Sequence, residues 1–284
     1  HAATKHHFNA YARSLGYLDW ATQPDPFRRY AGAPLFLLPF PESDGLPPYD
    51  RLFRAGSVEP RPLDLDTLAQ CFENSLAISA WKEFRGERWS LRCNPSSGNL
   101  HPTEGYAAVG AVPGLHDRPA VYHYAPREHG LERRTEIEPE TWRALMAGFP
   151  TGTFLAGLSS IHWREAWKYG ERAYRYCQQD VGHALGAYVM AAALLGWRCR
   201  LLDGLADAEI AGLLGLDRAQ DYADAEREHP DLLLAVMPSA SDGLVPRGLP
   251  EEPIAQIALG AWQGRANRLS ADHVEWSIID IVAD

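Results

Sequence analysis

The sequence is poor in cysteine and lacks the spacings that bind zinc. Only four cysteines occur among 284 residues, and no two of them form a CxxC pair. A chain of this length can bury a large core without disulfides, so we expect free thiols of a cytosolic protein. The pair His6–His7 belongs to no HExxH motif and is interpreted as part of a surface arm. We therefore expect no metal site.

Basic charge and long apolar runs are also scarce. The chain has 27 Lys and Arg against 37 Asp and Glu, a net charge of -10, which disfavours a nucleic-acid-binding protein. The longest apolar stretch, residues 181–197, contains His183 and is too short to span a bilayer. The N-terminal residues have no signal-peptide pattern. These features predict a cytoplasmic protein that binds neither nucleic acid nor membrane.

Several common active-site motifs are missing. No GxGxxG sequence follows a predicted strand, so a Rossmann nucleotide site is unsupported. Neither a Walker A loop nor a GxSxG elbow occurs, and the chain has no internal repeat.

Residues 1–62 combine proline with aromatic side chains. Nine of the 21 prolines fall in this region, and they disfavour both regular helix and central strand. A disordered tail would lack the aromatic residues found here, which include Phe8, Tyr11, Tyr17, Trp20, Phe27, Tyr30, Phe36 and Phe40. We expect an extended arm that wraps its own core or a partner subunit.

The rest of the chain alternates helices and strands without a regular βαβ repeat. Hydrophobic periodicity predicts helices over residues 64–79, 139–148, 164–195 and 206–216. Strands are predicted at 104–112, at 120–124, after a turn at His129–Gly130, at 198–202 and at 231–237. Residues 239–253 are expected to form a loop.

Local signals refine the predicted helices. Asp64 or Asp66 would cap the helix over 64–79. Asp203 or Asp207 would cap the helix over 206–216. Residues 187–196 are apolar all round, which predicts burial on every side.

Two glycines, Gly182 and Gly186, lie one turn apart in the longest predicted helix. Each costs about 1 kcal/mol against alanine. Close helix packing and contact with a flat ligand are both compatible with them.

The segment RCNPSSGNLHPTE, residues 92–104, has the composition of a binding loop. Pro95 and Pro102 fix the backbone, and Gly98 would let a ligand approach closely. Ser96, Ser97 and Asn99 offer polar side-chain groups, and Arg92 offers a fork for phosphate. The same residues also describe a capped turn before a strand.

This segment resembles the Arg-x-x-Pro-Ser-x-Gly-x-x-x-Pro-x-Glu loop of the nitroreductase-like flavoproteins, most closely the SagB-type (azoline) dehydrogenases. The matching positions are Arg92, Pro95, Ser96, Gly98, Pro102 and Glu104. Asn99 matches the Asn of the Pro-Ser-Ser-x-Asn loop found in other nitroreductases. In that family the loop lies along FMN. The resemblance therefore implies that Arg92 and residues 95–99 bind FMN.

A second segment, residues 167–197, is similar to the Lys-Tyr-x-x-Arg-x-Tyr-Arg region of the same family. The resemblance implies that Lys168 and Tyr169 are catalytic, with Tyr169 as general acid or base and Lys168 as its electrostatic partner. A weaker match at Asp203 and Gly204 implies backbone N–H groups facing the flavin. The early Arg-Arg-Ser-x-Arg phosphate motif of the family is missing.

Together these features predict an α+β fold with a central, mostly antiparallel sheet and helices around a long buried central helix. We expect a wrapping arm at 1–62, an FMN-binding domain at 63–240 and an extension at 241–284 that packs on itself or on a partner domain. The resemblance implies an FMN-dependent oxidoreductase acting on a small organic or peptide-azoline substrate. It also implies a homodimer with FMN at the interface, or one half of a tandem-domain protein.

Three alternatives remain open. Residues 168–172 could be a solvated helix start in which Glu165 and Glu171 pair with Lys168. The domain could have lost FMN and serve as a scaffold for a partner, as the missing phosphate motif suggests. A metal-dependent hydrolase would use His101, His123 and His162, although no ligand spacing supports it.

Overall fold

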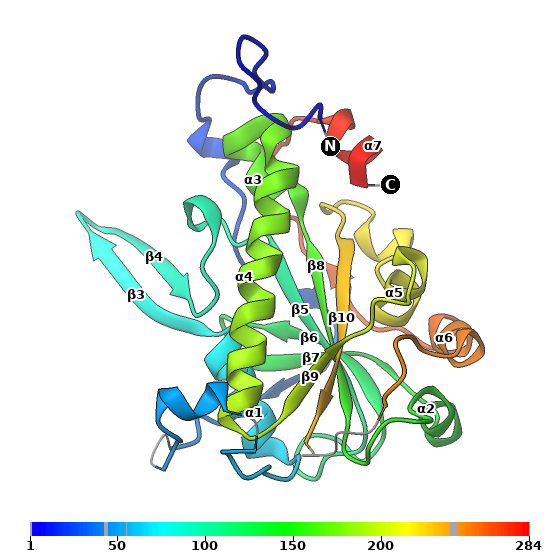
Figure 1. The fold of residues 1–284 in the computed structure, drawn as a ribbon. Helices are drawn as coiled ribbons and strands as arrows, with labels where there is room; N and C mark the ends of the chain where they lie inside the picture. The colour runs from blue at the N-terminus through cyan, green and yellow to red at the C-terminus, as the bar shows by residue number, and fades with distance from the viewer. Residues whose placement is uncertain (1, 43–44, 55, 239–243, 284) are drawn as a thin grey trace.

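Seven strands form one sheet in the order β2-β7-β6-β5-β8-β10-β9, and every neighbouring pair is antiparallel. The computed structural model describes residues 2–42, 45–54, 56–238 and 244–283. The strands are β2 (Leu35–Leu37), β5 (Thr103–Val109), β6 (Ala120–Ala125), β7 (Gly130–Glu136), β8 (Phe154–Ser160), β9 (Arg198–Leu201) and β10 (His229–Met237). The predicted α+β fold with an antiparallel central sheet is confirmed (Figure 1).

Helices cover both faces of this sheet. On one face lie α1 (Leu65–Ser75) and α4 (Ala173–Leu194), and on the other lie α2 (Pro139–Leu145), α5 (Asp207–Leu214) and α6 (Glu251–Ala258). Side chains of a strand alternate between faces, so Ala107 packs in the first core and Ala108 in the second. Strands β5 and β8 are consequently buried along their whole length.

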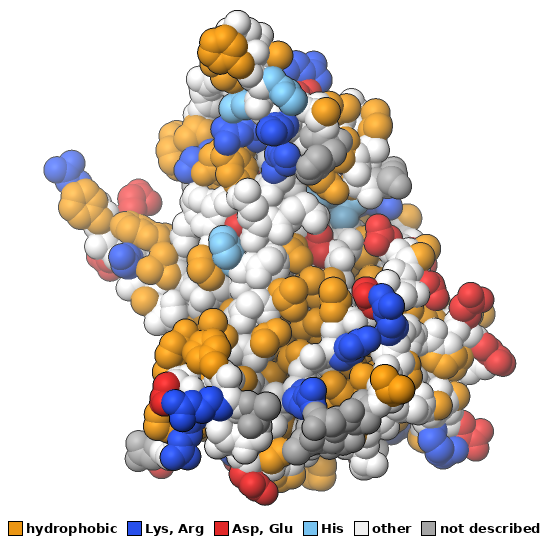
Figure 2. Space-filling view, viewed as in Figure 1, with side chains coloured by type: hydrophobic (Ala, Val, Ile, Leu, Met, Phe, Trp, Pro, Cys, Tyr) orange, Lys and Arg blue, Asp and Glu red, His pale blue; other side chains and the backbone are white. Residues whose placement is uncertain are grey.

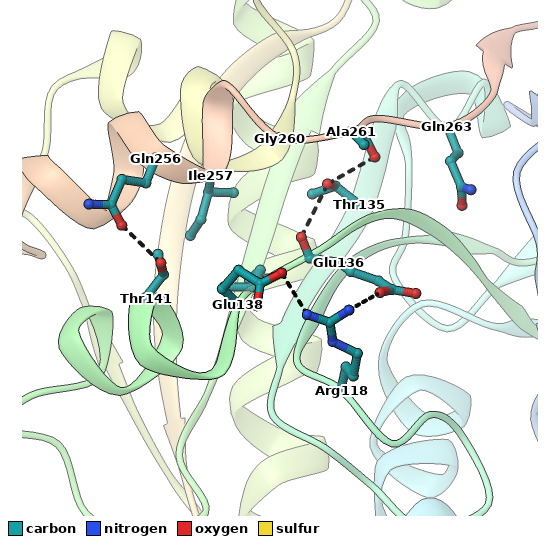
Figure 3. A pocket seen from close by; sticks show the side chains of 11 residues that line it. Arg118, Thr135, Glu136, Glu138, Thr141, Gln256, Ile257, Gly260, Ala261 and Gln263 are labelled. Atoms are coloured by element: carbon teal, nitrogen blue, oxygen red, sulfur yellow. Dashed lines mark hydrogen bonds and ion pairs between the residues drawn. The ribbon is translucent and has the colours of Figure 1, made fainter.

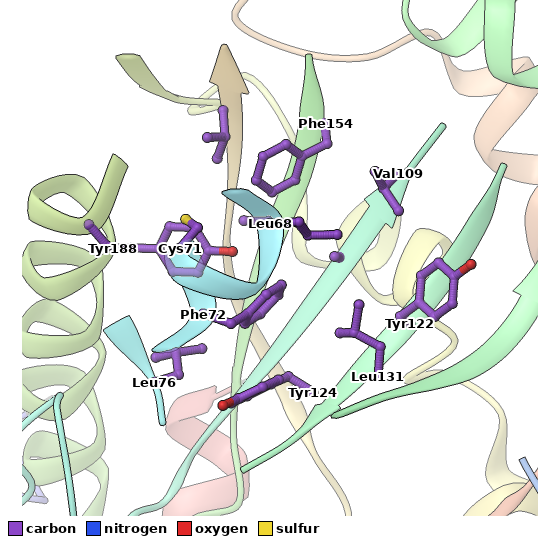
Figure 4. Packing of buried hydrophobic residues seen from close by; sticks show 14 of the residues in the cluster. Leu68, Cys71, Phe72, Leu76, Val109, Tyr122, Tyr124, Leu131, Phe154 and Tyr188 are labelled. Carbon is purple, nitrogen blue, oxygen red and sulfur yellow. The ribbon is translucent and has the colours of Figure 1, made fainter. Parts of the chain in front are cut away.

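The core under α1 is built on stacked aromatic rings. The Phe72 ring of α1 stacks on Tyr124 of β6 with centroids 4.6 Å apart, and meets Tyr188 of α4 edge-on at 5.9 Å. Figure 4 shows these rings with Leu68 and Phe154 filling the space between helix and sheet.

Helix α1 begins at its predicted cap. The Asp64 carboxylate accepts a hydrogen bond from the Thr67 backbone N–H at 2.8 Å, and the Thr67 hydroxyl oxygen accepts one from the Asp64 N–H at 2.9 Å. This reciprocal capping box fixes the first turn. The helix ends earlier than predicted because residues 78–84 form a strand.

Sequence reasoning missed the hairpin of β3 (Ile78–Phe84) and β4 (Glu87–Arg92), which projects from the body in Figure 1. Arg85 and Gly86 at its tip both have positive φ, as a two-residue hairpin turn requires. The overlooked signal is an Arg-Gly pair between two aromatic-rich runs.

The predicted helix over 164–195 is divided into α3 (His162–Tyr169) and α4. The break lies at Gly170, whose φ is +56° and whose Cβ, if present, would lie 2.3 Å from the Arg13 carbonyl oxygen. The expected burial on every side of α4 is wrong, because Val189 and Met190 are 44% and 43% exposed. The structure has open space beside both Gly182 and Gly186, so neither serves close packing within the described chain.

Two details near α5 and α6 also differ from expectation. No aspartate side chain caps α5; instead the Glu209 carboxylate accepts a hydrogen bond from the Ala206 N–H at 2.7 Å. The predicted loop over 239–253 is described only from residue 244, and its last residues already belong to α6.

The N-terminal arm joins the sheet of its own chain. Strand β2 pairs with β7, and β1 (Tyr30–Ala31) pairs with β11 (Arg265–Ala266) near the C-terminus. Phe27 and Tyr30 are buried, as expected. Most of the arm's aromatic side chains do not pack on the core of their own chain, since the following are exposed: Phe8, Tyr11, Tyr17, Trp20 and Phe40. Packing of these side chains on a partner subunit stays a prediction.

The remaining elements are short. The last helix is α7 (Ser277–Ala283), and 3₁₀ turns occupy Trp20–Thr22, Tyr49–Phe53, Ser97–Asn99, Gly170–Arg172 and Ala219–Tyr222. All four cysteines are free, as predicted. Within the described ranges, none of the helices combines the length and hydrophobicity needed to cross a membrane.

Charged side chains form a buried chain across the sheet. His123 of β6 lies between Glu104 of β5 and Glu132 of β7, at 2.9 Å from each carboxylate. Burial disfavours the charged imidazole, but the hydrogen bonds to both carboxylates outweigh it and raise the pKa of His123 to about 9.

This pKa predicts a specific loss of stability at alkaline pH. The folded-state pKa lies above the ordinary value of 6.5, so the stabilisation is fully present below pH 6.5 and is lost as pH rises through 9. The difference in free energy of unfolding between the wild type and His123→Gln should shrink by roughly 3 kcal/mol over that range. Urea unfolding at several pH values measures it, with His7→Gln as an exposed control. A constant difference would contradict the prediction.

Candidate functional site

The loop over 92–104 and the end of α3 lie against each other. Gly98 has a φ of +63°, and a Cβ at this position would lie 2.8 Å from the Tyr169 hydroxyl oxygen and 3.1 Å from Lys168 Nζ. The Lys168 side chain is exposed and Tyr169 is half-buried. The tertiary fold thus brings together two segments that are far apart in sequence and that both contain predicted site residues.

Asp180 of α4 holds this loop in place. Its buried carboxylate accepts hydrogen bonds from Ser96 Oγ at 2.8 Å, Ser97 N at 3.0 Å and Ser97 Oγ at 3.1 Å. The Ser96 oxygen in turn accepts one from the His101 N–H at 2.8 Å. Both predicted serine donors are therefore engaged inside the protein, and they make the loop rigid.

Sequence reasoning missed Asp180. The available signal was an acidic residue among the apolar positions Cys177, Val181 and Ala184 of one helix face. A carboxylate there requires hydrogen-bond donors from elsewhere in the fold.

Arg92 does not lie where the phosphate interpretation requires. Its side chain is buried, and it donates hydrogen bonds to the carbonyl oxygens of Pro26 and of Thr103. Burial lowers the pKa of Arg92 to about 10, with the nearby Arg164 charge adding to the effect and Glu104 opposing it. The fork expected to bind phosphate instead joins the arm to β5.

The other predicted cofactor ligands also have protein partners. Asn99 donates to the Ser90 carbonyl oxygen at 2.9 Å, and its side-chain oxygen lies 2.9 Å from His101 Nε2. The Gly204 N–H donates to the Arg247 carbonyl oxygen at 2.9 Å, and Asp203 pairs with the Arg247 guanidinium. The Gly204 N–H is therefore engaged within the protein, and the predicted contact of Asp203 and Gly204 with a flavin stays a prediction.

The acidic residues beside the Lys-Tyr pair do not form the helical ion pairs that were considered. Glu171 pairs with Arg13 of the arm at 2.6 Å. Glu165 is buried, whereas Lys168 is exposed. Burial and the Asp180 charge raise the pKa of Glu165 to about 9, against the opposing effect of Lys168. Glu165 is therefore a protonated acid at neutral pH, one turn before Tyr169.

A cavity of about 590 Å³ lies away from these residues, between β7, α2 and α6. Figure 3 shows that several of its polar side chains pair with one another. Arg118 binds Glu136 at 3.1 Å and Glu138 at 2.6 Å, while Thr141 donates to Gln256 at 2.8 Å. Most of its polar side chains are therefore engaged with one another, and Gln263 also lines the cavity.

A second cavity, of about 310 Å³, borders the predicted loop. It lies between the arm, the β3–β4 hairpin and Asn99. Its aromatic walls are Phe27, Trp81 and Trp89, and Arg88 stacks over Trp81 at 4.4 Å. This cavity has the flat apolar surfaces that receive a planar organic molecule.

The considered metal-hydrolase trio is not assembled. His123 lies between two carboxylates and His101 contacts Asn99. Across the described residues, the grouped metal-ligating side chains include His162 but neither of the other two.

The fold is an antiparallel sheet with helices on both faces, and its glycine-containing loop faces the junction of α3 and α4. Two solved structures share this α+β fold. One is a candidate nitroreductase from Anabaena variabilis, 25% identical with a TM-score of 0.58 over 78% of this chain. The other, from Ralstonia eutropha, is 17% identical with a TM-score of 0.53, and the match covers 80% of this chain and 97% of that protein.

Residues 57–225 match the Nitroreductase family, and the chain belongs to that family. A candidate nitroreductase of Methanocaldococcus jannaschii is 31% identical over 147 residues, which are 50% of this chain and 68% of the relative. Membership supports a flavin-type oxidoreductase in general terms. The chain spans only 42% of the Anabaena protein.

The contact at Gly98 predicts opposite effects for two glycine substitutions. Gly98→Ala forces a side chain into left-handed backbone and pushes the Tyr169 hydroxyl away, so the free energy of unfolding should fall by about 1–2 kcal/mol. Gly182→Ala is the matched control, because it meets open space within a helix and should stabilise by up to about 1 kcal/mol. Urea unfolding compares them. Equal effects would refute the packing of Gly98 on Tyr169.

Proposed function

We propose that the chain is an FMN-dependent oxidoreductase in which residues 95–99 and the pair Lys168–Tyr169 face the flavin. The observation that carries this proposal is the approach of Lys168 and Tyr169 to Gly98. Each segment resembles a flavin-contacting or catalytic segment of the SagB-type dehydrogenases. Their meeting in the fold supports a common site.

The residues at this contact fit FMN in chemistry. The loop is held rigid by Asp180, Gly98 lets Tyr169 and Lys168 approach its backbone closely, and Lys168 presents an exposed ammonium to an anion. Arg92 does not fit the phosphate, because it is buried and its two terminal nitrogens donate to the carbonyl oxygens of Thr103 and Pro26. We therefore assign the cationic role at this site to Lys168. Bound FMN would supply the hydride or electron transfer.

Tyr169 is proposed as the proton-transferring group. Burial and the neighbouring Glu165 raise the pKa of Tyr169, so its hydroxyl keeps its proton at neutral pH. Lys168 Nζ lies 5.4 Å from the centre of the Tyr169 ring, where its positive charge stabilises a transient phenolate. Tyr169 Oη would donate a proton to a reduced substrate, or accept one in the reverse direction, and Lys168 would act as its electrostatic partner.

The substrate class proposed is a small organic molecule or a peptide azoline. The aromatic cavity of Phe27, Trp81 and Trp89 next to Asn99 supports a planar substrate. The resemblance of residues 92–104 to SagB-type dehydrogenases supports the azoline alternative.

A second copy of the chain, or a tandem domain, is proposed to cover α4. Val189 and Met190 of α4 and Leu201 of β9 are all more than 40% exposed. Figure 2 shows hydrophobic side chains gathered on this face. Exposed apolar groups of this kind are typical of an interface. The fraction of the Anabaena protein left uncovered also has room for a second domain.

One observation favours a different function. The buried Arg92 and the missing phosphate motif leave FMN without the expected guanidinium. A domain that has lost FMN and scaffolds a partner would show the same features. Flavin content of the purified protein separates the two functions.

Tyr169→Phe and Arg92→Ala should have different consequences. Tyr169→Phe should retain FMN and reduce turnover about 10²-fold, because it removes only the transferable proton. Arg92→Ala should lower the free energy of unfolding by about 1–3 kcal/mol, because two buried carbonyl groups lose their donor. Released flavin, turnover and urea unfolding are measured for both. A wild type that neither contains nor takes up FMN would favour the scaffold function, and full activity of Tyr169→Phe would exclude its proton transfer.

The α4 interface is tested with Met190→Glu. A buried carboxylate at the interface should convert a dimer into monomers, because its desolvation is uncompensated. Phe84→Glu is the matched control, since Phe84 is an exposed hydrophobic residue on the β3–β4 hairpin. Light scattering after size-exclusion chromatography gives the molar mass. A monomeric wild type, or a dimeric Met190→Glu variant, would contradict a homodimer through this face.

A further inference from the structure

We propose that His162, His229 and Asp280 form a binding site for a divalent metal ion of the zinc type. The three residues come from α3, β10 and α7, and their ligand atoms all lie within 4.8 Å of one another. In the part of the chain that the structure describes, this is the one group of three in which a single ligand atom of each residue lies that close to the others. The site is independent of the proposed FMN function.

His162 provides the strongest indication of a missing ligand. Its side chain is only 6% exposed, and Nδ1 is buried without any hydrogen-bond partner among the described residues. The ring stacks on His229, with centroids 4.3 Å apart and planes 22° apart, so one ring turns when both in-plane lone pairs bind the same ion. A buried, unsatisfied ring nitrogen is costly, and a metal ion bound to Nδ1 would remove that cost.

The donor set matches zinc. Two imidazoles and one carboxylate are established zinc ligands, and three protein ligands leave a position for water. The adjoining cavity of about 300 Å³ is lined by all three residues and gives the ion a path from solvent. Asp231 lies beside His162 and His229, but its oxygens accept hydrogen bonds from Ser160 and Gln178, so we do not count it as a ligand.

The site would fasten the C-terminal helix to the core. Helix α7 is only seven residues long, and Ile279 is its one buried side chain, in a cluster with Trp163 and Trp167. A metal ion bound by Asp280, His162 and His229 would attach α7 to the core at a second point. His162 and Tyr169 are the two ends of α3, about 10 Å apart along its axis, so the metal would not take part at the proposed flavin contact.

The first experiment measures binding of Zn²⁺ alone. The protein is stripped with a chelator, desalted and titrated with zinc chloride against a chromophoric competitor. We expect one equivalent to bind, and His229→Gln and Asp280→Asn each to weaken it about tenfold or more. The double variant His6→Gln/His7→Gln is the control for the exposed N-terminal histidines and should bind like the wild type.

The second measurement tests whether zinc binding fastens α7 to the core. Hydrogen exchange of residues 277–283 should slow when zinc is added to the wild type, and remain unchanged in Asp280→Asn. Asp280 is exposed, so this variant decides the question even if His229→Gln fails to fold. The proposal is overturned if no zinc binds, if Asp280→Asn binds as tightly as the wild type, or if binding disappears in the His6→Gln/His7→Gln control.

Discussion

The buried ion pair between Glu104 and Arg164 is the contact on which the rest of the structure depends. Glu104 lies in the central strand β5 and also binds His123. Arg164 of α3 further donates to the carbonyl oxygens of His101 and Asp25. One guanidinium therefore joins sheet, loop, helix and arm. Removing either partner of such a pair leaves an unpaired buried charge, which typically costs about 3–5 kcal/mol.

This ion pair also explains the geometry of the candidate site. Helix α3 contains Lys168 and Tyr169, while the loop that precedes β5 contains Gly98. Since Arg164 fixes α3 against β5, and Asp180 fixes the loop against α4, the two segments meet in a defined arrangement. The Glu104 match to the flavoprotein motif is thus best understood as structural: it positions the helix with the Lys-Tyr pair. The opposite end of α3 contributes His162 to the proposed zinc site.

Much of the fold follows from local sequence signals. The Asp64 cap of α1, the strands β5 and β6 and the helix α5 all lie where residue patterns predicted them. The hairpin at β3–β4 and the break at Gly170 were missed. Gly170 must be glycine because the Arg13 carbonyl approaches it, and that neighbour comes from a distant part of the chain.

The sequence alone determined the α+β class, the free thiols and the two segments that define the candidate site. Only the tertiary structure decided what those segments do. Arg92 was expected at a phosphate, but the fold surrounds it with backbone carbonyls; Ser96 and Ser97 were expected at a cofactor, but Asp180 accepts their hydrogen bonds. The physical reason is that a polar side chain binds whichever complementary group the topology brings within about 3 Å, and that partner is not encoded in its own local sequence.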